Sequence, residues 1–214
     1  MSETKNLIED IQSNIDKLQQ CENDYRTYVD THIENVGKAW KEEVSKLDDE
    51  FIKENYNDIS ILIKDHDLSK YGDEEFQAYR ANYYPVDDEE KTANEANFQS
   101  AWYHHFQNNP HHWQHWIDEE GELIPLENED IVKRAYVEMI CDWQAMGYVF
   151  GDTANQYYNQ NKDTIKLYPE LKKWVEDLLK KLDNKSDKKK TTKKKAIKDK
   201  STKKSKKEEN ENEK

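Results

Sequence analysis

Apolar residues recur at spacings of three and four along most of the chain, which is the period of a helix with one buried face. Similar stripes predict helices at about 24–47, 48–67, 73–84, 89–107, 110–116 and 129–150, with a last helix beginning near Pro169. No segment keeps the alternation typical of a β-strand. The pattern therefore predicts an all-α fold in a single domain. A further stripe, before these, predicts the first helix at about 7–18 and consists of Leu7, Ile8, Ile11, Ile15 and Leu18.

Turn-forming residues set the expected helix boundaries. Asp73, directly after Gly72, is the expected N-cap of the short helix that stops before Pro85. Asn109 followed by Pro110 has the form of an N-cap with proline in the first helical position. Gly151 is expected to close the helix at 129–150.

The charge of the chain changes sign near residue 184. Of the 33 basic and 46 acidic residues, 14 lysines and 6 acids fall in 185–214, a net of +8 that leaves −21 for the rest. Residues 185–214 contain only two apolar residues, Ala196 and Ile197, which are too few to offset the entropy of ordering this segment. We therefore expect a helical domain at 1–183 and a disordered, lysine-rich tail at 184–214. The alternative for the tail is an electrostatic tether to nucleic acid or to an acidic partner.

Composition excludes several classes of protein. The five glycines never cluster, which argues against the phosphate-binding loops of P-loop and dinucleotide-binding proteins. No apolar run approaches the roughly 18 residues of a membrane helix, and the polar, acidic start is unlike a signal peptide. Two cysteines give no disulfide framework and fit a reducing cytoplasm. A body of net charge −21 would repel nucleic acid, so such a partner is conceivable only through the basic tail.

The histidines carry the main functional signal, because all seven lie between His32 and His115. His32 shares a helix face with Tyr28, Val29 and Val36, so it is expected to point inward. A single inward histidine is also compatible with a hydrogen-bonded core residue. His66 and Asp67 close the third predicted helix, and Lys70 follows within one turn of both.

A carboxylate lies on the apolar face of the helix at 129–150. Asp142 shares that face with Ala135 and Met139, where an ionised group is costly unless it is paired or coordinated. Glu138 lies one turn earlier, and a hydrogen bond from a tyrosine or from Arg134 is the alternative explanation for Asp142. Together with the histidines, these groups form a mixed nitrogen and oxygen donor set. Such a set suits Mn, Fe, Co, Ni or Zn.

The order of these residues resembles the HD superfamily of metal-dependent phosphohydrolases. His32, the pair His66-Asp67 and the late Asp142 follow one another as in that superfamily, and HDLSK is similar to the HDxGK variant of members with two metals, with serine in place of glycine. The segments HDLSKYGDEEFQAYR and AWYHHFQNNPHHWQHW resemble an uncharacterised bacterial and phage family with HDxSK and NxHHW motifs. The resemblance covers about residues 25–150. It implies an HD-like helical bundle in the cytoplasm of a bacterium or of a phage-infected cell.

The resemblance also implies a ligand set for one or two divalent transition-metal ions. One ion would be held by His32, His66, Asp67 and Asp142. Two-metal members use the aspartate at the position of Asp67 as a bridge and add two histidines from the intervening helices. Here the favoured pair is His105 and His112, with His104 and His111 as their alternates, and His115 is expected at the surface or behind the ligands. The alternative for HHFQNNPHHWQHW is an aromatic, histidine-rich packing segment without metal.

Three hypotheses for function follow. The first is hydrolysis of a small phosphorylated substrate, most plausibly a nucleotide, by metal-activated water. Asp67 would serve as a shared ligand, Lys70 as a fixed cation for the phosphate, Glu138 as a supporting group or proton acceptor, and Tyr103, Trp113 and Trp143 as surfaces for a base or sugar. The second is di-iron oxygenase chemistry on the same fold. The third is a non-enzymatic, phage-type interaction protein whose metal is structural.

Overall fold

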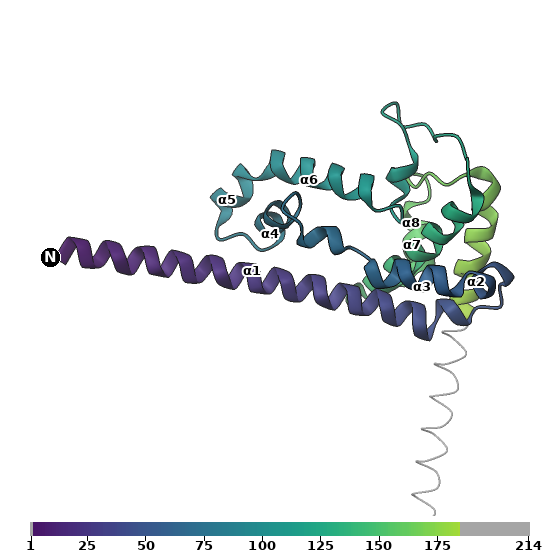
Figure 1. The fold of residues 1–214 in the computed structure, drawn as a ribbon, viewed down its shortest axis with the longest axis horizontal. Helices are drawn as coiled ribbons and strands as arrows, with labels where there is room; N and C mark the ends of the chain where they lie inside the picture. The colour runs from purple at the N-terminus through teal and green to yellow at the C-terminus, as the bar shows by residue number, and fades with distance from the viewer. Residues whose placement is uncertain (1, 185–214) are drawn as a thin grey trace, which may run out of the picture.

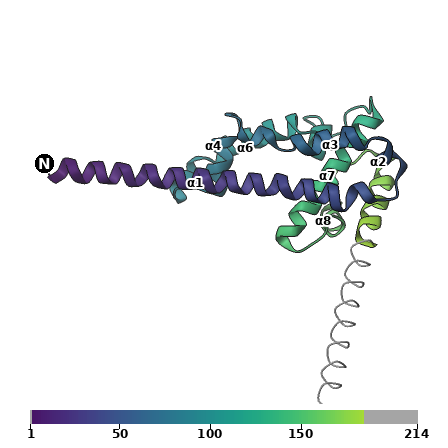
Figure 2. The same ribbon diagram turned by 60° about the horizontal axis from the view of Figure 1, so that its bottom comes forward.

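The computed structural model describes residues 2–184. Its first element is a single helix of 41 residues, α1 (Ser2–Glu42). The two helices predicted at 7–18 and 24–47 are joined, because the segment between them contains neither proline nor glycine to end the first. The first half of α1 extends beyond the rest of the molecule, and the second half packs against the other helices (Figures 1 and 2).

The helix predicted at 48–67 is divided into two. A 3₁₀ turn η1 (Val44–Lys46) leads to α2 (Glu50–Glu54), where Asp49 caps the helix by accepting from the backbone N–H of Ile52 at 3.2 Å. Asn55 separates α2 from α3 (Tyr56–Asp65). The chain then makes a second 3₁₀ turn, η2 (Leu68–Tyr71).

The middle of the chain corrects two of the predicted boundaries. Helix α4 (Phe76–Tyr83) begins after Glu75, so Asp73 is not its N-cap; residues 73–75 form a turn instead. The helix predicted at 89–107 divides at Asn94 into α5 (Asp88–Ala93) and α6 (Glu95–Asn108). No helix begins at Pro110, since residues 110–112 form a turn and the 3₁₀ helix η3 (Trp113–Trp116) starts after His112.

Helix α7 (Glu129–Phe150) is the centre of the fold. Asn128 caps it by accepting from the N–H groups of Asp130 and Ile131, and Gly151 ends it in the left-handed conformation with φ of 88°. It packs against α1, α3 and α8 (Ala154–Asn161). A last helix at 169–184 completes the core with Leu171, Val175 and Leu178.

These features confirm the predicted all-α class. Within residues 2–184 the β-structure is limited to one isolated bridge between Ile117 and Leu123. The same part of the chain contains no helix long and apolar enough to cross a membrane. The predicted tail lies outside the described residues, except for residue 184 at its boundary.

Candidate metal centre

The turn that follows α3 places two consecutive side chains in one buried cluster. Adjacent residues of a helix point about 100° apart, but α3 ends at Asp65 and His66 is its C-cap. Asp67 then takes the left-handed conformation, with φ of 58° and ψ of 13°. His66 Nε2 and Asp67 Oδ2 are consequently 3.6 Å apart, and both residues are 1% exposed.

One group of possible ligand atoms gathers around His32 of α1. His32 Nε2 lies 3.2 Å from His66 Nε2 and 3.4 Å from Asp67 Oδ2. The same nitrogen is 3.2 Å from Asp142 Oδ1 on α7. Three helical elements that are far apart in sequence therefore bring the four predicted ligands of the first ion into contact.

A second group gathers around the other oxygen of Asp67. Asp67 Oδ1 is 3.3 Å from His105 Nε2 and 3.4 Å from His111 Nε2. His112 Nε2 completes this group at 2.9 Å from His105 Nε2. His66, His111 and Asp142 form a further set of mutually close donor atoms, so the two groups are contiguous. These buried histidines and aspartates could hold a metal ion.

The donor set fits a divalent cation better than it fits a hydrogen-bonded core. Asp67 Oδ1 and His111 Nε2 are both buried, and neither makes a hydrogen bond. A buried polar atom without a partner costs roughly 1–3 kcal/mol. Imidazole nitrogens that face a carboxylate oxygen across 3.3–3.4 Å are instead the arrangement of ligands around a shared centre.

Buried carboxylates hold the imidazole rings from behind. Glu138 Oε1 accepts from His66 Nδ1 at 2.8 Å and lies 3.2 Å from His111 Nδ1. Glu75, which is 0% exposed, accepts from His105 Nδ1 at 2.7 Å. Because Nδ1 is held by a carboxylate, Nε2 is the ring nitrogen that points at Asp67, and loss of its proton gives the tautomer that a metal ligand requires.

The three histidines of the second group differ from the expected pair. His105, His111 and His112 all face Asp67, whereas His104 lies outside both groups. Its Nδ1 donates to Glu75 Oε1 at 2.8 Å and its side chain is 38% exposed, because on α6 it is turned about 100° away from His105. His115 also lies outside, with Nδ1 donating to the carbonyl oxygen of Phe106 at 3.2 Å.

Lys70 supplies the cation closest to the shared carboxylate. Its Nζ donates to Asp67 Oδ2 at 2.6 Å and lies 5.6 Å from the centre of the Tyr79 ring. The 3₁₀ turn η2, rather than a continuation of α3, brings Lys70 back over Asp67. The side chain of Lys70 is 14% exposed, so the ammonium is largely withdrawn from solvent.

The carboxylates of the cluster favour positive charge on the groups that face them, whereas burial and the neighbouring His111 and His105 lower the pKa of His112. Burial lowers the pKa of His32, but the facing carboxylates of Asp142 and Asp67 outweigh it and raise that pKa to about 9. For His111 the carboxylates of Asp67 and Glu138 outweigh burial and raise the pKa to about 10. Burial raises the pKa of Glu138, yet its contacts with His111 and His66 lower that pKa to about 2. The site therefore keeps its carboxylates ionised and attracts positive charge.

Two hollows meet at this cluster. One, of about 340 Å³, is lined by His111, His112 and Asp142 together with aromatic side chains from α6, η3, α7 and α8. Those aromatic residues are Trp102, Trp113, Trp143, Phe150 and Tyr157. The other, of about 400 Å³, lies on the His32 side and shares Met146 and Phe150 with the first. Tyr103 lines neither hollow and is 56% exposed.

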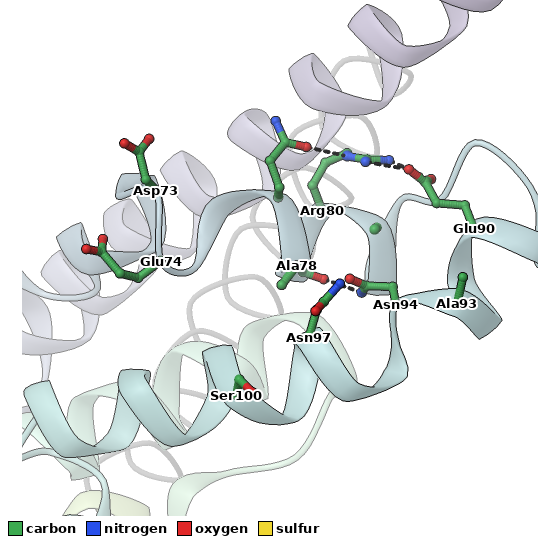
Figure 3. A pocket seen from close by; sticks show the side chains of 11 residues that line it. Asp73, Glu74, Ala78, Arg80, Glu90, Ala93, Asn94, Asn97 and Ser100 are labelled. Carbon is green, nitrogen blue, oxygen red and sulfur yellow. Dashed lines mark hydrogen bonds and ion pairs between the residues drawn. The ribbon is translucent and has the colours of Figure 1, made fainter.

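A third hollow, of about 500 Å³, lies between α4, α5 and α6 and contains none of the clustered histidines. Figure 3 shows the paired side chains on its wall. Arg80 donates through both terminal nitrogens to Glu90, at 2.7 and 2.6 Å, and Asn94 donates to the carbonyl oxygen of Ala78 at 2.7 Å. These bonds attach α5 and the start of α6 to α4, which makes this hollow part of the scaffold.

Sequence reasoning did not identify Glu75, Ser69 or Asn109 as part of the site. Ser69 Oγ is 3.3 Å from His105 Nδ1, and Asn109 Nδ2 donates to Ser69 Oγ at 2.8 Å. The sequence shows that an acidic residue follows the HDLSK segment, but three acids are consecutive at 73–75. Only the turn that these residues form in the structure determines that Glu75 is the one that contacts His105.

The chain belongs to the DUF5662 family, described as a family of unknown function, whose model matches residues 21–188. The matched span includes every residue of the cluster and begins after the exposed first half of α1. No curated protein and no solved structure matches the chain.

Proposed function

We propose that this DUF5662 protein is a metal-dependent phosphohydrolase that acts on a small phosphorylated substrate, most simply a nucleotide. The observation that supports this best is the position of Asp67, whose two carboxylate oxygens face two adjoining groups of histidines. A carboxylate shared in this way suits two neighbouring divalent ions. The order of the ligands along the chain agrees with the HD resemblance.

Bound divalent ions at such a centre would polarise a phosphoryl oxygen and lower the pKa of a coordinated water. His32, His66, Asp67 and Asp142 would hold one ion, and Asp67, His105, His111 and His112 the other. Glu138 and Glu75 keep the imidazole rings oriented through their Nδ1 atoms. Lys70, already held against Asp67, would offer its ammonium to the negative charge of the phosphate.

The aromatic hollow favours a substrate that carries a planar aromatic group. The rings of Trp143 and Tyr157 line this hollow with their centres 5.4 Å apart and their planes tilted by 48°, next to the proposed ligands His111, His112 and Asp142. Gln114 lines the same hollow, and its Oε1 is buried without a hydrogen bond. A nucleobase offers both a flat apolar face for the rings and an N–H donor for Gln114 Oε1.

Metal analysis of untagged protein, followed by phosphate release from a panel of nucleotides, tests this proposal. The informative variants are Asp67→Asn, since asparagine tolerates the left-handed backbone there, and His105→Gln. The matched control is His115→Gln, the same change outside the cluster. We expect Asp67→Asn and His105→Gln to lose bound metal and to reduce phosphate release by more than about 100-fold, beyond the loss typical of supporting residues.

The alternatives appear as distinct outcomes of the same experiment. Absence of bound metal after purification and metal addition would refute the proposal. Tightly bound metal that raises the melting temperature, with no turnover of any phosphate ester, would indicate a structural metal instead. Bound iron with substrate-dependent oxygen consumption and no phosphate release would indicate the oxygenase.

A further inference from the structure

The first half of α1 carries an apolar stripe that the rest of the described chain leaves uncovered. Leu7, Ile8 and Ile11 are 59%, 62% and 51% exposed, and Ile15 and Leu18 are also exposed. This part of the helix stands clear of the other helices in both views (Figures 1 and 2). Most of the stability of a helix in a protein comes from packing of its apolar face against other elements.

The stripe has the spacing of a coiled-coil seam. Ile8 and Ile15 occupy positions a, and Ile11 and Leu18 occupy positions d, of successive seven-residue repeats. The next position a is Glu22, which accepts from Gln77 Nε2 of the body at 2.8 Å, and beyond it the same phase continues into the buried face through Tyr25, Val29, His32, Val36 and Ala39. The body of the protein therefore covers this seam from Tyr25 onward, and the exposed stripe is its uncovered continuation.

The residues beside the seam favour a second copy of this chain as the occupant. The e and g positions beside the seam hold Lys5, Leu7, Gln12, Asn14, Gln19 and Cys21, and Lys5 is the only charged residue among these six. A different protein partner is usually selected by a pattern of complementary charges at these positions, and a single lysine does not provide such a pattern. The acids Glu9, Asp10 and Asp16 lie on the outer face, where they would oppose contact with an anionic membrane.

If two copies pair through this stripe, the folded body that follows it in each copy (residues 25–184) determines whether the two helices run parallel or antiparallel. In a parallel pair, both bodies would compete for space beside the same ends of the two helices, and each carries a large negative charge. An antiparallel pair instead aligns Ile8 with Leu18 of the second copy and Ile11 with its Ile15, so every large seam residue has a partner. Glu22 of one copy would then be about 27 Å from Glu22 of the other, at 1.5 Å per residue, well beyond the Debye length of about 8 Å.

We propose that two copies of this chain form an antiparallel helical dimer through residues 4–22 of α1. The contact is isologous, so it closes after two copies and does not propagate into a filament. It spans fewer than three repeats, which is short for a coiled coil. We therefore expect a reversible dimer with a dissociation constant on the order of 10 μM.

Sedimentation velocity of the full chain from 1 to 300 μM tests the dimer. We expect Ile11→Glu/Ile15→Glu to remain monomeric throughout, with a circular dichroism melting curve that still shows a folded body. The control Asn6→Glu/Ser13→Glu adds the same charge to the same segment on its outer face, and should dimerise like the unmodified chain. A monomeric unmodified chain at 300 μM, or an unchanged dimer in Ile11→Glu/Ile15→Glu, would overturn the proposal.

Disulfide trapping in a Cys21→Ser background tests the orientation. Ile8→Cys and Leu18→Cys protomers should crosslink when mixed and not when either is oxidised alone. Crosslinking of Ile8→Cys with itself would show a parallel pair and overturn the antiparallel arrangement. If the chain stays monomeric and binds phosphatidylcholine vesicles through the same stripe, the stripe contacts a membrane and not a second copy, which would also overturn the proposal.

Discussion

The uptake of metal should depend steeply on pH, because protons must leave the cluster first. His32 belongs to the first group of donors and His111 to the second, and their pKa values are raised to about 9 and about 10. Both imidazoles are therefore protonated in the metal-free protein between pH 6 and 8. A metal ion binds only the neutral ring, so each ion must displace one proton.

The number of displaced protons, one per ion, sets how steeply the metal affinity depends on pH. One displaced proton makes the apparent binding constant rise tenfold per pH unit, which is about 1.4 kcal/mol. Between pH 6 and 8 the affinity for each ion should rise about 100-fold, and the product of the two constants about 10⁴-fold. The rise should level off above the two raised pKa values, near pH 9–10, where the rings are already neutral.

Isothermal titration calorimetry of the metal-free protein with Zn²⁺ or Mn²⁺ measures the protons directly. Repeating the titration at pH 7 in buffers of different ionisation enthalpy should give about one proton released per ion. Glu138→Gln removes a carboxylate that raises the pKa of His111, so proton release at pH 8 should fall in this variant. No proton release at pH 7, with an affinity independent of pH from 6 to 8, would refute the reasoning.

Four further predictions concern the supporting structure and the stability of the metal-free protein. Glu75→Ala should weaken metal binding about 10–100-fold in a chelator competition assay, because His105 loses the acceptor that orients it. Gly147→Ala should lower the melting temperature through a loss of roughly 1–3 kcal/mol, since the added Cβ would lie 2.5 Å from the backbone oxygen of Asp152. Gly37→Ala, with no atom within 4 Å, should instead stabilise the protein by up to about 1 kcal/mol, and equal effects of the two changes would contradict this account. The two histidines with raised pKa values, His32 and His111, contribute fully to the stability of the metal-free protein below pH 6.5. That contribution is lost as pH rises through 9–10, so the melting temperature should fall. An unchanged melting temperature would contradict these pKa values.

The long periodic helices could be predicted from sequence because their signals are local. The segment at 129–150 has a capping asparagine before it, a closing glycine after it and a consistent apolar stripe between, and α7 has the same bounds. The short elements could not be placed in this way. Asp73 and Asn109 are both good capping residues, but the helices start later because tertiary contacts of Glu75 and His112 fix the turns.

The cluster itself was partly accessible from the sequence. The inward position of His32 follows from helical spacing, and the position of Asp142 follows in the same way. Helical spacing can tell which histidine of a neighbouring pair joins the cluster in one of the two pairs but not in the other. His104 and His105 lie on one helix, so spacing separates them, and only His105 joins the cluster. His111 and His112 lie in a turn, where no period applies, and both join it.

The backbone conformation of Asp67 restricts which amino acids this position can tolerate. A positive φ is readily adopted only by glycine, asparagine and aspartate among the common residues, and Asp67 is the one non-glycine residue with such a φ between residues 2 and 184. Two donor oxygens facing opposite groups require a carboxylate, which glycine and asparagine lack. In a saturation library of this position, folding should therefore accept three residues and metal binding only one. Glutamate, usually the closest substitute for aspartate, should fail on backbone strain as well as on reach.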